Sequence, residues 1–395
     1  MPLAREQIAA RLRDRRQQLG FTQAQVADAL EIHRPTVSEI EAGRRAVTSE
    51  ELYTFCQLYA ISVGALLSDP APNTDQVTAV LYRRQGLDSA TARVAVQRFI
   101  DRCRAEKELE AALGLDEPHE RPSYRANPPA SKREAIQQGN RIADQERMRL
   151  QIGNQPIRDP LAQLERQGVR IGAVTAIHED QIDGLYFESA DIGACVAVNP
   201  ARDEWTGFRS SFTAAHEYAH WLLQDVPVEL FAFQPGTDDL QEVRANAFAA
   251  AFLMPEGAIR EFFGNLGLLK NECIWQLSPG DVVRAMDHLG VSRQALLYRL
   301  LNLRLISEKV AEPLWDFPVT QVARRLGIEF GTRRYAGTRL PALAIHAWRT
   351  GLLAAGRAAE LCGMDLQEFR AFVIEIGEQP ATYEGTPLVG ASARE

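Results

Sequence analysis

The sequence is poor in cysteine, and its cysteines are scattered. Five occur in 395 residues, and no two of them form a C-x-x-C pair. An odd, dispersed set argues against a disulfide framework and favours a reducing compartment. We therefore expect a cytoplasmic protein.

Long apolar runs are also missing. No stretch of 18 consecutive apolar residues occurs, and charged residues interrupt the opening segment, MPLAREQIAARLRDRRQQ, every few positions. That pattern fits neither a signal peptide nor a membrane span. The sequence predicts no membrane partner.

An excess of positive charge is the third absence. Lysine and arginine number 44 against 52 acidic residues, for a formal net charge of -8. A protein that coats nucleic acid would be basic, so any DNA binding here must be local and modular. The apolar fraction of 46% is ordinary for a globular protein, and the length favours two or three domains.

The pattern along the chain predicts a mostly helical, multidomain α+β protein. Residues 1–70 are expected to form a bundle of short helices, and 71–131 a helical connector with a proline-rich linker. Residues 132–306 contain helices and three β-like runs, VRIGAVTAI, GLYFES and ACVAVNP, which predict a small antiparallel sheet. Residues 307–395 are expected to be a helical region of unknown role that begins with a turn-rich connector.

The strongest motif is H-E-x-x-H in the segment SSFTAAHEYAHWLL. Apolar residues recur around it at helical spacing, and Ser210 or Ser211 is placed to cap the helix. His216 and His220 are four residues apart, so one helix face can offer two imidazoles to an ion about 2 Å from each. Glu217 lies on the neighbouring face, where it can reach a zinc-bound water. The alternative is an ordinary helix that happens to contain two histidines.

A catalytic zinc site also needs a third protein ligand and an open fourth position. The best candidate is Glu242 in QEVRANAFAAAFLMP, on a second predicted helix that should stop at Met254, before Pro255. Asn246 on that helix is placed to orient the carboxylate or an imidazole. The residues alone leave open a solvated carboxylate as the alternative for Glu242.

Together these segments resemble the ImmA/IrrE family of metallo-endopeptidases. The resemblance rests on HEYAH, on EVRANAFAAAFLMP after it, on the preceding VAVNP…FRSSFTAAHEYAHWLL and on the later VSRQALLYRLLNLRLI, and it covers about 133–306. It implies that His216, His220 and Glu242 hold Zn²⁺, with Mn²⁺ as the other candidate, and that Glu217 is the general base. Members of this family cut helix-turn-helix repressors.

Two further features of such a site remain open in the sequence. The residue that stabilises the oxyanion is not identifiable, with Tyr186, Arg209 and Tyr218 as the candidates. A substrate segment is expected to add as a strand beside CVAVNP, so that main-chain hydrogen bonds hold it over the metal.

The N-terminal region contains a second motif, FTQAQVADALEIHRPTVSEIEAGRRAVTSEEL. Thr22 with Gln25, and Thr48 with Glu51, form capping-box patterns. Two short helices joined by a three-residue turn are expected over residues 23–30 and 34–41. In helix-turn-helix geometry the second helix enters the major groove of DNA. The alternative is a helical protein-interaction module without DNA.

Residues 4–67 resemble the phage-repressor, or XRE, family through R-x-Q-L-G-F-T-Q and T-V-S-E-I-E-A-G-R-R. The resemblance implies a phosphate contact for Gln23 and an ion pair between Arg16 and Glu41. It also implies base-edge contacts from the second helix and backbone contacts just after it, and these fall on Arg34, Ser38 and Glu39, and on Arg44 and Arg45.

Two functions are compatible with these motifs. The first is a regulator that binds a double-stranded DNA operator, as a homodimer, and cleaves a repressor or antitoxin protein, its own N-terminal module included. The second is a transcription factor or antitoxin that uses the peptidase fold to sense a ligand or a metal without cutting. The intact H-E-x-x-H favours the first, and the fusion to a DNA reader favours the second.

Overall fold

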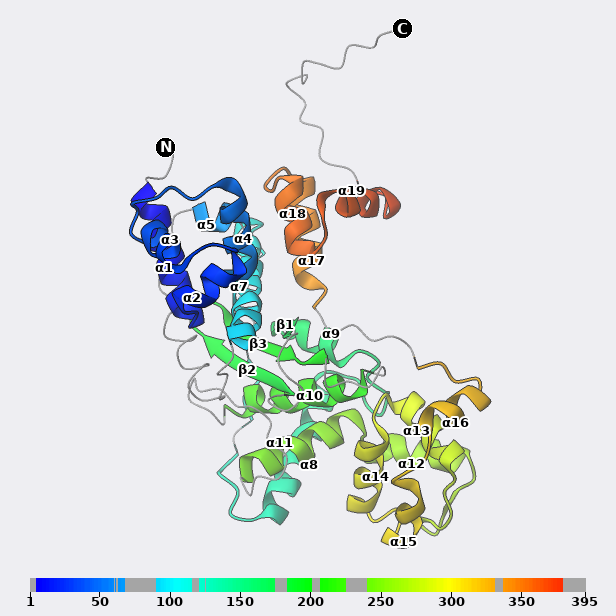
Figure 1. Cartoon of the computed structure of the whole chain (residues 1–395). Helices are drawn as coiled ribbons and strands as arrows, with labels where there is room; N and C mark the ends of the chain where they lie inside the picture. The colour runs from blue at the N-terminus through cyan, green and yellow to red at the C-terminus, as the bar shows by residue number, and fades with distance from the viewer. Residues whose placement is uncertain are drawn as a thin grey trace. The chain divides into compact units, whose positions relative to one another are not determined.

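The computed structural model describes residues 5–59, 61, 63–67, 90–115, 121–124, 126–174, 183–200, 207–224, 240–330 and 337–378. The chain divides into two compact units, Met1–Asp101 with His119–Ala336, and Arg102–Pro118 with Gly337–Glu395. Helices dominate both units, and strands are few (Figure 1). The predicted mostly helical α+β class is confirmed. None of the described helices has the length and apolar character needed to cross a membrane.

The N-terminal bundle consists of five short helices around one apolar core. The helices are α1 Arg5–Leu19, α2 Gln23–Ala29, α3 Arg34–Glu41, α4 Ser49–Tyr59 and α5 Val63–Leu67. Both predicted capping boxes form, because Thr22 and Thr48 each accept from the backbone three residues on while Gln25 and Glu51 reach back to their amides. The core side chains are Leu12, Leu19, Val26, Val37, Ile40, Phe55 and Tyr59.

Helix α7, Ala90–Ala112, follows this bundle, and its first half belongs to the same unit. The Arg15 guanidinium on α1 donates to Asp101 on α7 at 2.8 Å. On the sheet side, Phe99 packs edge-on against Phe187, with ring centroids 5.8 Å apart. Helix α7 thus contacts both the N-terminal bundle and the sheet described next. Residues 76–89 of the predicted helical segment lie outside the described residues.

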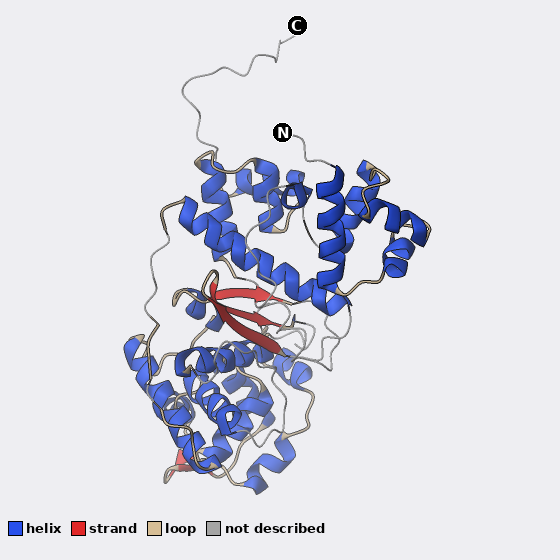
Figure 2. Cartoon of the chain, turned by 90° about the vertical axis from the view of Figure 1, so that its left-hand side faces the viewer, coloured by secondary structure: helices blue, strands red, loops and turns tan. Residues whose placement is uncertain are grey.

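A three-stranded sheet forms one layer of the domain that follows α7 within the first unit (Figure 2). This domain is here called the second domain. Its order is β1-β3-β2, from β1 Arg170–Ala173, β2 Gly184–Ser189 and β3 Gly193–Val198. Strand β2 runs antiparallel to β3, as predicted, but β1 runs parallel to β3, so the sheet is mixed. The parallel pair requires a crossover between β1 and β3, and β2 lies within that connection in the sequence.

Helices pack on the sheet and on one another to form the main core. The α-helices are α8 Lys132–Arg149, α9 Pro160–Glu165, α10 Phe208–Leu223, α11 Leu240–Leu253, α12 Glu256–Asn265, α13 Pro279–Leu289, α14 Arg293–Asn302, α15 Glu308–Ala311 and α16 Val319–Arg325. A short hairpin, β4 Leu269–Lys270 with β5 Cys273–Ile274, and a 3₁₀ turn, η2 Glu312–Leu314, complete this domain. Helix α11 ends at Leu253, one residue before the predicted stop. The segment expected to be a turn-rich connector contains α15, η2 and α16, so that expectation was wrong there.

The second unit combines the end of α7 with three more helices, α17 Arg339–Arg349, α18 Ala355–Cys362 and α19 Leu366–Glu375. Leu109 of α7 shares an apolar cluster with Leu340 and Leu343 of α17. The Arg339 guanidinium donates to Glu110 at 2.6 Å in the same unit. The predicted helical C-terminal region is therefore present over the described residues 337–378.

Gly139 sets the spacing between α8 and α11. A Cβ atom at this position would lie 2.4 Å from the Arg244 carbonyl oxygen and 2.8 Å from the Phe248 amide nitrogen. Those are backbone atoms, which cannot move away without separating the two helices. The absence of a side chain at residue 139 is thus a requirement of this packing.

We expect Gly139→Ala to lower the free energy of unfolding by about 1–3 kcal/mol, because the added methyl group overpacks the α8–α11 contact. Denaturant unfolding measures the change. The matched control is Gly264→Ala on α12, where a Cβ atom meets nothing within 4 Å, so the same substitution should leave stability unchanged or raise it. Equal effects at the two positions would contradict this account.

Candidate metal centre and nucleic-acid interface

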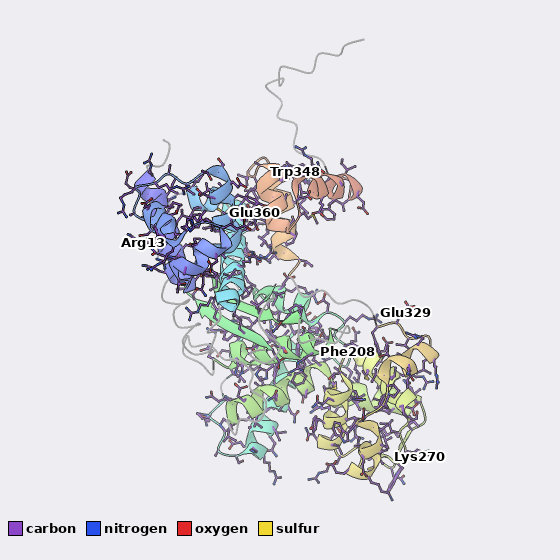
Figure 3. All side chains as sticks on the ribbon, in the orientation of Figure 1. Arg13, Phe208, Lys270, Glu329, Trp348 and Glu360 are labelled. Carbon is purple, nitrogen blue, oxygen red and sulfur yellow. The ribbon has the colours of Figure 1, made fainter. Side chains whose placement is uncertain are left out.

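Helix α10 occupies the interior of the second domain, with almost every side chain buried. It begins at Phe208, after Gly207 in the left-handed conformation (φ 67°). Phe208 itself lies inside the domain (Figure 3), edge-on to Phe330. The predicted serine cap was wrong because the helix starts earlier than expected. Ser211 lies within the helix, and its hydroxyl donates to the Gly207 carbonyl oxygen.

Three predicted ligand side chains converge between α10 and α11. The Nε2 atoms of His216 and His220 are 3.1 Å apart. The Glu242 carboxylate from α11 lies 3.1 Å from the first of them and 3.3 Å from the second. All three side chains are buried, and they form a group of the kind that holds a metal ion. The structure thus brings Glu242 to the imidazole pair rather than to solvent.

The separations between these atoms fit a small tetrahedral ion. Bonds of about 2.0 Å at tetrahedral angles place ligand atoms roughly 3.3 Å from one another. The carboxylate oxygens of Glu242 make no hydrogen bond of good geometry among the described residues, although both are shielded from solvent. Two imidazole nitrogens and a carboxylate are ligands that zinc accepts. The residues present therefore fit a divalent cation.

Glu217 lies beside this group without belonging to it. Both of its carboxylate oxygens are buried and have no hydrogen-bond partner in the described part of the chain. Burial raises the pKa of Glu217 to about 8, and although the His216 charge opposes this, Glu242 and Asp183 add to it. A carboxylate in such a place gains from any proton or cation that reaches it. That property suits a proton acceptor close to neutral pH.

Asn246 fixes the orientation of one imidazole. Its Oδ1 atom lies 3.1 Å from Nδ1 of His216. With the amide oxygen accepting from Nδ1–H, the lone pair of His216 is on Nε2, which faces the other two ligands. Asn246 reaches this position because it follows Glu242 by four residues on α11.

Burial and mutual contact act in opposite directions on the pKa values of His216 and Glu242. Burial alone would lower the pKa of His216, but the contact with Glu242 and the charge of Glu217 outweigh it, so the pKa of His216 is raised. Burial likewise opposes ionisation of Glu242, yet its contacts with both histidines lower the pKa of Glu242. The carboxylate is thus held ionised and faces the two imidazoles.

The three candidates for an oxyanion helper are all engaged elsewhere. The Tyr186 hydroxyl donates to Glu188 at 3.0 Å, and Arg209 makes two hydrogen bonds to Asp183. The Tyr218 hydroxyl donates to the buried Glu146 carboxylate in the core. The described residues therefore leave the assignment open.

The structure also changes the expected place of a substrate strand. The predicted docking segment, CVAVNP, includes β3, and β3 is the central strand, paired with β1 on one side and with β2 on the other. It has no free edge, so that prediction was wrong. Sequence reasoning missed Gly184, the first residue of β2, where a Cβ atom would lie 2.4 Å from the Thr213 methyl group and 3.6 Å from Glu217 Oε1. Glycine directly before an aromatic β run was the available signal.

The N-terminal bundle has helix-turn-helix geometry, and α3 is its second helix. Arg34 and Glu39 are exposed on α3 and Ser38 is half-buried, while Val37 and Ile40 face the core. The turns before and after α3 place His33 and Arg44 at the surface as well. One face of α3 is thus exposed, and it carries the residues for which base contacts were predicted.

Several other predicted residues form a network inside this bundle. The Arg16 guanidinium makes two hydrogen bonds to Glu41, at 2.6 and 3.0 Å, which links α1 to α3. The Gln23 side chain donates to the same carboxylate at 3.0 Å, and Arg45 donates to Glu51 at 2.8 Å. The structure brings Arg16 and Glu41 together, and it ties Gln23 to that pair at the beginning of α2.

Comparisons with known families agree with this division of the chain. Residues 7–68 match the model of a helix-turn-helix domain, and residues 164–301 match the IrrE N-terminal-like domain, a peptidase family. The chain is therefore an XRE-type helix-turn-helix domain fused to a domain of the ImmA/IrrE metallopeptidase family. The predicted fusion is confirmed.

No curated protein matches the chain. Among solved structures, the crystal structure of ComR from Streptococcus suis aligns with 95% of this chain and 89% of its own, at 11% identity and a TM-score of 0.16. A score that low supports no argument about fold or function.

The convergence of ligands predicts one tight divalent-cation site per chain. We expect about one equivalent of Zn²⁺ in the wild-type protein, and His220→Ala or Glu242→Gln should reduce the affinity by more than the 10–100-fold expected for Asn246→Ala. Competition with a chromogenic chelator gives the affinities. The matched control is Glu256→Gln, an exposed first-turn glutamate on α12. Undiminished zinc affinity in Glu242→Gln would refute the site.

The exposed face of α3 predicts a sequence-specific DNA contact. Arg34→Ala should weaken binding to the preferred duplex by roughly 1–3 kcal/mol, about 5–150-fold, and relax the preference at one base pair. Duplexes selected from random sequence on the wild-type protein supply the probe, and fluorescence anisotropy the affinity. Arg260→Ala on α12 is the control. Unchanged binding by Arg34→Ala would count against α3 as the reading helix.

Proposed function

We propose that this protein is a DNA-binding transcriptional regulator whose second domain is a zinc-dependent endopeptidase that cleaves a repressor or antitoxin protein. Its own N-terminal module is among the candidate substrates. The observation that carries the proposal is the buried group of His216, His220 and Glu242 with Glu217 beside it. A regulator that no longer cut would have no use for a buried, unpartnered glutamate next to three metal ligands.

The chemistry assigned to the protein's residues follows from their places. When bound, the cation polarises the scissile carbonyl and lowers the pKa of water. Glu217 accepts the proton of the attacking water and passes it to the leaving amine, because its buried carboxylate lies beside the metal ligands with no hydrogen-bond partner among the described residues. Asn246 keeps His216 in the tautomer that leaves Nε2 available. Burial of α10 excludes bulk water from these groups.

A substrate segment is proposed to pair with β2 instead of β3. The Asn199 amide donates to the Asp183 carbonyl oxygen, and the Val198 carbonyl accepts from Val174 on the opposite side. In the alternating antiparallel ladder, the main-chain groups of Gly184 and Tyr186 therefore point away from β3. That edge begins beside Glu217, so an added strand would pass close to the metal ligands.

The helix-turn-helix domain favours a second candidate function. Because residues 7–68 form such a domain, the chain could regulate transcription by binding DNA while the peptidase fold senses a metal or another ligand without cutting. This function requires the metal group and α3 but gives no task to Glu217. The two candidate functions therefore differ in whether they require Glu217.

Glu217→Gln is expected to abolish cleavage and retain zinc. Glutamine has nearly the same shape, so folding and metal content should persist while the proton acceptor is lost. The wild-type and variant proteins, loaded with Zn²⁺ or Mn²⁺, are incubated with the protein whose gene is next to the gene for this chain. Mass spectrometry then detects fragments from cleavage at a single peptide bond. Asp287→Asn, an exposed acidic residue on α13, serves as the control. If the wild type cuts no partner but binds its operator, the second candidate holds.

The proposed edge pairing predicts a specific change in hydrogen exchange. In the Glu217→Gln variant, addition of a bound substrate peptide should slow exchange of the Gly184 and Tyr186 amides at least tenfold. The Leu185 and Phe187 amides, which already face β3, should change little. Exchange measured residue by residue by NMR provides the test. Equal protection of all four amides, or of none, would exclude this edge.

A further inference from the structure

A polar cavity of about 770 Å³ lies at one end of α8. Its walls come from the segment before α8, from one face of α8 and from the end of α10. The lining residues that carry the argument are Asn127, Glu134, Gln137, Gln138, Arg141 and Gln224. The volume is within the range of a ligand-binding cleft, but the walls are more polar than apolar, and four of the ten lining side chains are carboxamides.

Two helices connect this cavity to the metal group. On α10, Leu223 lines the cavity and follows His220 by three residues, so it continues the ligand-bearing face one turn further along, and Gln224, directly after the helix, lines the cavity too. On α11, the buried Arg244 follows Glu242 by two residues. The Arg244 guanidinium donates to the Gln138 side chain at 2.8 Å and to the Asn127 carbonyl oxygen at 3.3 Å. The cavity therefore begins about one turn of α10 beyond His220, and Arg244, which lies on the opposite face of α11 from Glu242, holds the Gln138 wall of the cavity in place.

The one acidic side chain of the described wall, Glu134, is already hydrogen-bonded within it. Glu134 accepts from the Ala130 amide at 2.8 Å and from Gln138 at 3.2 Å. Arg141 is the single cationic residue among the described lining. The side chains of Asn127 and Gln137, by contrast, are exposed to the cavity. The wall thus offers neutral groups that both donate and accept hydrogen bonds.

We propose that this cavity, here called the carboxamide groove, binds an extended segment of a polypeptide through its main chain. A carboxamide matches a peptide unit, because each has one N–H donor and one carbonyl acceptor. A phosphorylated or nucleic-acid ligand would need more cations than Arg141 provides. The inference deepens the proposed function: the groove holds part of the protein substrate beyond the residues that meet the metal.

The experiment separates peptide binding from cleavage. Glu217→Gln protein loaded with Zn²⁺ is mixed with an equimolar library of random decapeptides, and the retained peptides are quantified by mass spectrometry after rapid ultrafiltration. The same measurement is made on Glu217→Gln with Asn127→Ala and Gln137→Ala. The matched control carries Gln145→Ala, an exposed glutamine on α8 outside the groove. Zinc content and thermal unfolding of each variant establish that folding and the metal group are intact.

The groove variant should retain about tenfold less peptide, and the control should match Glu217→Gln. Equal retention by the groove variant and the control overturns the inference, as does the absence of retention by all three proteins. Cleavage of the library by the wild type is read separately. Cleavage that persists when Asn127→Ala and Gln137→Ala are introduced into the wild type, without Glu217→Gln, leaves the peptidase standing and removes the groove. Retention that depends on the groove, without any cleavage by the wild type, leaves the groove standing and removes the peptidase.

Discussion

The fold of the second domain is built around a group of ionisable side chains that has been removed from water. Two imidazoles and the Glu242 carboxylate face one another within 3.3 Å, and a second carboxylate, Glu217, lies beside them with no partner among the described residues. Burying carboxylates is costly unless a cation or donors compensate them. A divalent cation held by the two imidazoles and Glu242 compensates both carboxylates, because the ligand atoms of those three side chains lie close together and Glu217 is beside them. The position of α10 in the core, the proximity of α11 and the orientation imposed by Asn246 all serve that single constraint.

The packing around this group explains how the ligands are held in place. Helix α11 supplies Glu242 and Asn246 to the metal group, its Arg244 donates to Gln138 in the wall of the carboxamide groove, and its close contact with α8 depends on Gly139. The sheet covers α10 on the other side, with the edge strand β2 beginning next to Glu217. Helix α7 contacts the far face of that sheet through Phe99 and the N-terminal bundle through Asp101. The sheet that covers α10 is thus in direct contact with α7, the helix that follows the N-terminal bundle in the chain.

Local patterns in the sequence were sufficient for much of the structure. Spacing along one helix placed His216 and His220 together, and capping boxes at Thr22 and Thr48 marked real helix starts, since both depend on neighbours in the chain. The meeting of Glu242 with the histidines depends on the packing of two helices, so the residues alone gave Glu242 as the best candidate with a solvated carboxylate as the alternative, and the family resemblance favoured the ligand. Strand order is likewise set by tertiary pairing, so the central place of β3 and the importance of Gly184 were beyond the pattern. The serine cap failed because Gly207, with its left-handed backbone, starts α10 earlier.

The central claim is that two imidazoles and one carboxylate from α10 and α11 hold a single ion. X-ray absorption at the zinc K-edge of the zinc-loaded protein tests it without any assay of activity. The account predicts a shell of about four nitrogen and oxygen ligands near 2.0 Å, with outer-shell scattering from two imidazole rings that falls to one ring in His220→Ala. A shell containing sulfur, or one without imidazole scattering in the wild type, would contradict it.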